Sequence, residues 1–121
     1  MKKIDFTKVR VFTNYKKEAY EVCNVREVVI NYLYSHAPAS GLTRSLLQRL
    51  AENEGEIEIT NSEEKLILNL ANTEGLITEV FRDSLLIALN QDLLNEKLQG
   101  KTHIEEVSAT MRELLVEINN Q

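Results

Sequence analysis

The chain has 121 residues, of which 43% are apolar and 27% charged, and its formal net charge is −5 at pH 7. This composition is typical of one soluble globular domain and excludes a disordered chain. It also excludes a membrane span, because no apolar run approaches the roughly 20 residues that a transmembrane helix needs. The opening residues lack the apolar core of a signal peptide, and the single Cys23 cannot form an internal disulfide. We therefore expect a cytoplasmic protein with no membrane segment.

Charge is distributed unevenly along the chain. Residues 1–49 contain nine Lys and Arg against four Asp and Glu, whereas residues 50–121 contain five against fifteen. Opposite charges favour the packing of the two halves side by side in one compact domain. A basic N-terminal half that contacts nucleic acid is the alternative, although the basic stripe is thin and the whole chain is acidic.

The N-terminal elements predict a β-hairpin. Residues 8–13, KVRVFT, alternate in the manner of a half-buried strand, and residues 18–23, EAYEVC, resume a strand after a polar turn at 14–17. If this chain binds nucleic acid, the candidate contacts are the basic and aromatic residues of this hairpin: Lys8, Arg10, Tyr15, Lys16 and Lys17.

Two helices are expected next. Asn24 and Glu27 have the spacing of a capping box, and an apolar stripe then continues until Pro38 ends the helix. A second helix over 42–52 has leucines on its inner face and ends near Gly55, which can adopt the left-handed conformation of a helix end.

The acidic stretch 54–72, EGEIEITNSEEKLILNLAN, predicts a strand followed directly by a helix. Ile57 and Ile59 would face the core, and Thr60 with Glu63 would form a capping box. We expect strand 56–60 to pair with strand 8–13, because its glutamates would then face basic side chains. A calcium loop is excluded, because its first ligand position would fall on a leucine.

The C-terminal third predicts two long helices. The first, over about 78–98, is apolar on more than one face, so it is expected to be buried or to meet a partner. Thr102 and Glu105 would cap the second, which covers about 103–119 and has an apolar seam spaced by three and four residues: Ile104, Val107, Met111, Leu114 and Ile118. This seam is the candidate partner-binding surface. We expect it to pack on another subunit, in an antiparallel or exchanged arrangement, or on the back of helix 78–98.

No residue pattern predicts chemistry. Cys23 lies just before a helix start and His36 near the end of the same helix, but no Asp or Asn is obviously placed to orient the histidine. Two histidines and one cysteine without metal-ligand spacing do not indicate zinc, and no glycine-rich phosphate-binding motif occurs. We therefore predict no catalytic residue, no cofactor and no metal.

Three segments of the chain carry a resemblance: KKIDFTKVRV, NVREVVINYLY, and GEIEIT followed by an acidic helix. In this order they resemble small uncharacterised proteins encoded by phages, prophages and related mobile elements of gut bacteria. The resemblance covers about residues 2–90, and its segments contain no catalytic motif. It implies an accessory or assembly role without an enzymatic site, and it transfers no functional residue.

These patterns together predict an α+β fold, in which a hairpin and a third strand pack on helices. Residues 1–100 would form one domain, and 101–121 would form a C-terminal amphipathic helix. A winged helix is the alternative fold. It is less favoured, because the sheet of a winged helix mostly follows its helices, whereas this hairpin comes first. We expect a non-enzymatic interaction or assembly protein that binds a protein partner or itself as a homo-oligomer; the alternative is a small nucleic-acid-associated regulator.

Overall fold

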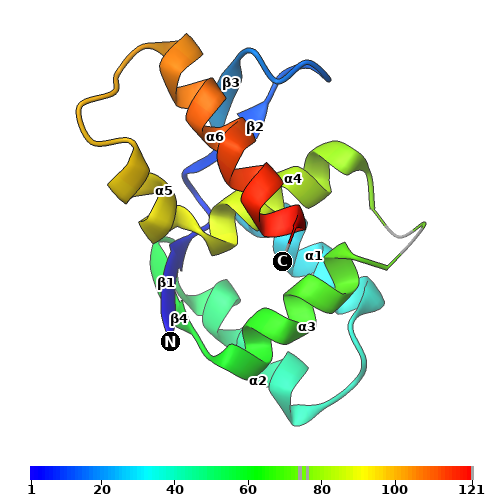
Figure 1. Ribbon diagram of the computed structural model, residues 1–121. Coiled ribbons are helices and arrows are strands. Elements are labelled where there is room, and N and C mark those ends of the chain that lie inside the picture. Colours follow the sequence, from blue (N-terminus) through cyan, green and yellow to red (C-terminus); the bar gives the residue numbers. More distant parts are fainter. Residues whose placement is uncertain (74, 76, 121) are drawn as a thin grey trace.

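Figure 1 shows a computed structural model that describes residues 1–73, 75 and 77–120. Within these residues the chain forms four strands and six helices, which confirms the predicted α+β class. None of the helices in these ranges combines the length and the apolar composition that a membrane crossing requires. In chain order the elements are β1 (Lys2–Asp5), β2 (Val9–Phe12), β3 (Tyr20–Cys23), α1 (Arg26–His36), α2 (Gly41–Glu52), β4 (Glu56–Ile59), α3 (Asn61–Ala71), α4 (Glu79–Leu89), α5 (Gln91–Lys97) and α6 (Ile104–Asn119).

The predicted hairpin is confirmed. β2 and β3 pair antiparallel, with Val9 opposite Cys23 and Phe12 opposite Tyr20. Val9 and Phe12 are buried, whereas Val22 on β3 is exposed. β2 therefore packs on the core, and much of β3 faces solvent.

The strand predicted at 56–60 pairs with a strand that was not predicted. β4 pairs antiparallel with β1, with Ile4 opposite Ile57 and Lys3 opposite Glu58. The predicted pairing with strand 8–13 is therefore wrong. β1 places Lys3 opposite Glu58 but Asp5 opposite Glu56, so the charge rule fits one of the two glutamates and did not identify the partner strand.

One of three predicted capping boxes forms. The Thr60 hydroxyl accepts from the Glu63 amide at 3.1 Å, and the Glu63 carboxylate accepts from the Thr60 amide at 2.8 Å. The boxes predicted at Asn24 and Thr102 are wrong, because α1 and α6 begin one residue later and have no side-chain cap. The Asn24 side chain accepts instead from the Arg26 amide at 3.1 Å.

The single helix predicted over 78–98 is also wrong, because it is divided at Asn90. The Asn90 amide side chain donates to the Leu86 carbonyl at 2.8 Å, which competes with continuation of the helix. The break turns Gln91 toward β1, where its side chain accepts from the Asp5 amide at 3.0 Å and donates to the Asp5 carbonyl at 3.1 Å.

Two apolar cores share α4, which explains why it is apolar on more than one face. Residues 84–89 are all buried. Leu85, Ala88 and Leu89 pack into a first core with β1, β4 and helices α1 to α3. Leu86 and Ile87 pack into a second core with Phe12, α5 and α6 (Figure 1). α4 therefore connects the two halves of the fold.

Candidate functional site

The predicted seam on α6 packs within its own chain. Val107, Met111 and Leu114 are buried in the second core against α4 and α5, and Ile118 is half-buried beside them. Ile104 is 51% exposed. Of the two arrangements expected for this seam, the structure shows the one on the helix 78–98 segment. Three of its five residues are unavailable to a partner while the chain keeps this fold.

The acidic stretch has a structural role at its centre. Glu63 is buried and pairs with Arg49 of α2, whose guanidinium also donates to the Glu58 carbonyl. Glu56 and Glu58 are exposed. In the described ranges, no group of three or more His, Cys, Asp or Glu side chains is arranged to hold a metal ion. This stretch therefore joins β4 to α3 and to α2.

Cys23 is the last residue of β3 and precedes α1, whereas His36 is the last residue of α1, a helix of 11 residues that is about 16 Å long. The Cys23 thiol is 3.9 Å from the Glu21 carbonyl, and the exposed His36 ring lies 4.9 Å from the Tyr32 ring. A nucleophile and base must lie within hydrogen-bond reach of each other, so this pair does not form a catalytic dyad.

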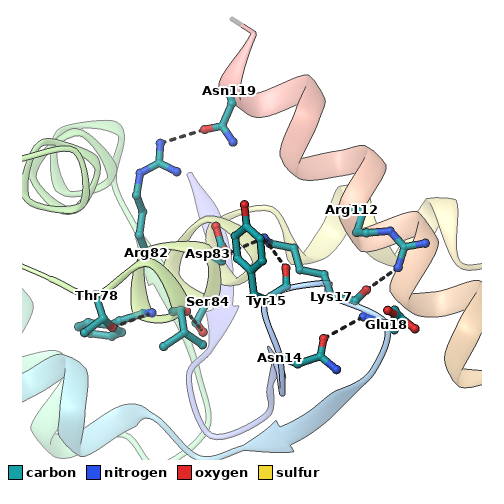
Figure 2. A network of polar contacts seen from close by, with 12 residues as sticks. Asn14, Tyr15, Lys17, Glu18, Thr78, Arg82, Asp83, Ser84, Arg112 and Asn119 are labelled. Atoms are coloured by element: carbon teal, nitrogen blue, oxygen red, sulfur yellow. Dashed lines mark hydrogen bonds and ion pairs between the residues drawn. The ribbon is translucent and has the colours of Figure 1, made fainter.

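A cleft of about 360 Å³ lies between the tip of the β2–β3 hairpin and the first turns of α4. Figure 2 shows the polar contacts around it. Its walls come from both elements and combine apolar, acidic and basic side chains: Phe12, Thr13, Asn14, Tyr15, Lys17, Glu79, Val80 and Asp83. We call this feature the hairpin–α4 cleft. It contains two of the residues predicted as contacts from sequence, Tyr15 and Lys17.

The hairpin tip is held by several contacts. The Lys17 amide donates to the Asn14 carbonyl at 3.1 Å, and the Asn14 side chain accepts from the Glu18 amide at 3.4 Å, which closes the turn. Lys17 adopts a left-handed backbone conformation, with φ of 58°. Arg112 of α6 donates to the Lys17 carbonyl (Figure 2). The tip is thus fixed to α6 from outside the hairpin.

Asp83 is one of the two acidic residues that line the cleft. Its side chain is 13% exposed, and its carboxylate lies 3.8 Å from the Lys17 ammonium. Burial raises the pKa of Asp83, the negative charge of Glu79 adds to this effect, and the positive charges of Lys17 and Arg82 oppose it. With Glu79 in the first turn, the cleft carries two acidic side chains against one lysine.

Apolar surface surrounds this charge. Tyr15 is 92% exposed and Val80 is 47% exposed, while Phe12 is buried at the junction with the second core. Thr78 caps α4 by accepting from the Phe81 amide at 3.3 Å, which fixes the first turn on which Glu79 and Val80 lie. Exposed apolar side chains therefore flank a mostly buried carboxylate.

The four basic residues predicted as nucleic-acid contacts differ in their surroundings. Lys8 and Lys16 are exposed. The Arg10 guanidinium lies 5.9 Å from the centre of the Tyr20 ring, on the adjacent strand. The Lys17 ammonium faces Asp83 and the Tyr15 ring, 5.1 Å from the ring centre. Two of the four basic side chains are thus occupied by contacts inside the chain.

Sequence reasoning did not identify Glu79, Val80 and Asp83 as part of a site. Their spacing places them on one side of a helix start, but nothing local connects that side to a hairpin more than sixty residues earlier.

Comparison of the chain with protein-family models, with curated proteins and with solved structures finds no match in any of the three.

Proposed function

We propose that this chain is a non-enzymatic interaction protein that binds a protein partner through the hairpin–α4 cleft. The observation that carries the proposal is the pair of exposed apolar side chains, Tyr15 and Val80, on opposite walls of a cleft whose backbone is fixed on both sides. Tyrosine is enriched in protein interfaces, because its large side chain buries apolar area at low entropic cost and can also hydrogen-bond.

The fixed geometry of the cleft favours binding. The tip is held by its own turn and by Arg112, and the first turn of α4 is capped by Thr78. A wall that is already ordered loses little conformational freedom when a partner binds, so more of the contact energy appears as affinity. The resemblance to mobile-element proteins, which implies an accessory or assembly role, supports the same class of function.

A nucleic-acid partner is less well supported by the charges of the cleft. A phosphate backbone that reached Tyr15 and Lys17 would approach the carboxylates of Glu79 and Asp83, which repel it. The lysine that would attract it faces Asp83 at 3.8 Å. A peptide segment that carries no phosphate does not meet this repulsion.

The proposal is tested with random peptides displayed on phage and selected against the wild-type chain. Selected peptides are then synthesised, and their dissociation constants are measured by fluorescence anisotropy. We expect Tyr15→Ser and Val80→Ser each to weaken binding about tenfold or more, whereas Tyr34→Ser, a control at an exposed tyrosine on α1, leaves it unchanged.

Two results would overturn the proposal. One is a selection whose peptides bind the Tyr15 and Val80 variants as well as the wild type. The other is tight, salt-dependent binding of a single-stranded oligonucleotide that is lost when Lys8 and Lys16 are replaced by glutamine, which would support the nucleic-acid alternative.

A further inference from the structure

The Asp83 carboxylate is poorly compensated for its burial. Its side chain is 13% exposed, and in the described ranges its one ionic or hydrogen-bonded contact is the Lys17 ammonium at 3.8 Å. That distance is longer than a charge-assisted hydrogen bond, which is about 2.7–2.9 Å. Glu79 adds a second negative charge nearby. A mostly buried carboxylate gains from a closer cation, because its own hydration is already reduced.

The position of Lys17 shows which group the cleft accepts. Its ammonium lies 5.1 Å from the centre of the Tyr15 ring and 3.8 Å from the carboxylate of Asp83, and it donates to the Tyr15 carbonyl at 3.3 Å (Figure 2). An aromatic face and a carboxylate are both favourable neighbours for a cation. The contact with Asp83 is longer than a charge-assisted hydrogen bond, so it leaves the carboxylate open to a closer cation. The space beside it, lined by Val80 and Phe12, suits the aliphatic stem of a basic side chain.

Resting on the proposed function, we propose that the partner inserts a lysine or arginine side chain, flanked by apolar residues, between Tyr15 and Asp83. The flanking residues cover Val80, and the cationic group forms the closer ion pair that Lys17 does not supply. The partner segment is therefore basic and apolar, and Lys17 competes with it for the same carboxylate.

This competition gives two substitutions with opposite effects. Asp83→Asn removes the charge that attracts the cation, so it weakens binding. Lys17→Asn removes the competing ammonium and retains a residue that tolerates a positive φ, so it strengthens binding. Matched controls remove an exposed charge of the same sign outside the cleft: Asp92→Asn on α5 and Lys16→Asn at the hairpin tip.

The experiment uses the peptides selected above on the wild-type chain. We expect them to be enriched in lysine or arginine with apolar neighbours. Replacement of the basic residue of a selected peptide by methionine, and Asp83→Asn in the protein, are each expected to weaken binding about tenfold. Lys17→Asn is expected to strengthen it severalfold, and both controls leave it within twofold. Circular dichroism and urea midpoints verify that every variant is folded.

The outcomes separate this inference from the proposed function. Peptides that require Tyr15 and Val80 but contain no basic residue, or bind Asp83→Asn as tightly as the wild type, would overturn the inference and leave the function standing. Weaker binding by Lys17→Asn would also overturn it, because Lys17 would then contact the partner directly. Peptides indifferent to Tyr15 and Val80 would remove both proposals.

Discussion

The substitution Met111→Ala tests whether α6 belongs to the folding unit of the whole chain. Met111 is 0% exposed and packs in the second core against α4 and α5. Replacing a buried methionine by alanine removes its transfer free energy and leaves a cavity, which costs about 2–5 kcal/mol. A domain of this size has a free energy of unfolding of about 5–15 kcal/mol, so the loss is a large share of it. Val116→Ala on the same helix is the control, because Val116 is 59% exposed and should change stability by less than about 0.5 kcal/mol.

The assay is urea unfolding followed by helical circular dichroism, because the chain contains no tryptophan. Amide signals of Leu46 in the first core and Leu114 in the second are followed in parallel by nuclear magnetic resonance. We expect both signals to disappear at one midpoint, lower than in the wild type, because α4 contributes to both cores.

Two results would refute this reasoning. A loss below about 1 kcal/mol would show that the second core does not hold Met111 as tightly as its burial implies. An early transition of Leu114 with an unchanged midpoint for Leu46 would show that 1–100 and 101–121 unfold separately, which is the division predicted from the sequence.

Three further substitutions test other parts of the fold. Thr60→Ala should lower the free energy of unfolding by about 1 kcal/mol, because the Glu63 amide loses its acceptor; an unchanged urea midpoint would contradict the cap. Ile4→Ala should cost about 2–5 kcal/mol, whereas Val22→Ala on the exposed side of β3 should cost little; equal effects would argue against β1 as a core strand. Burial raises the pKa of Asp83 above its ordinary value of 3.8, so the folded chain binds this proton more tightly than the unfolded chain. The stability that this proton contributes is fully present below pH 3.8 and is lost as the pH rises through the raised pKa. The urea midpoint of the wild type minus that of Asp83→Asn should therefore fall across that pH range. A difference that stays constant with pH would refute this prediction.

Features set by neighbouring residues were predictable from the sequence. The Thr60–Glu63 box lies within four residues, and the hairpin strands are separated by a short turn. Spacing was necessary but not sufficient, because Asn24–Glu27 and Thr102–Glu105 have the same spacing and form no capping box. The same reasoning placed α2, which was predicted to cover 42–52 and is observed over Gly41–Glu52.

Features set by tertiary contact were missed. β1 contains one apolar residue, Ile4. It becomes a strand because it pairs with β4, which follows α1 and α2 in the sequence. The break at Asn90 was missed because the residues on both sides have helical apolar spacing, and only the contact of Gln91 with Asp5 shows what the break achieves. Local propensity is a weak guide where distant segments determine the outcome.

The candidate cleft was half predictable for the same reason. Tyr15 and Lys17 were named because an exposed aromatic beside basic residues at a turn is visible in the sequence. Asp83 gives no such signal, since a single aspartate in a helix is ordinary until the fold places it 3.8 Å from a lysine of a distant hairpin.

The backbone of Lys17 is relevant to the role that we propose for this cleft. A left-handed conformation suits glycine or asparagine, and costs other residues about 1 kcal/mol or more. The backbone contacts of Lys17 would be available to glycine or asparagine as well: its amide donates to the Asn14 carbonyl, and its carbonyl accepts from Arg112. What the lysine adds is an ammonium that donates to the Tyr15 carbonyl at 3.3 Å and lies 3.8 Å from Asp83 and 5.1 Å from the centre of the Tyr15 ring. The unfavourable backbone is therefore retained together with a side chain that connects the hairpin tip to α4, which is the arrangement that the proposed binding cleft requires.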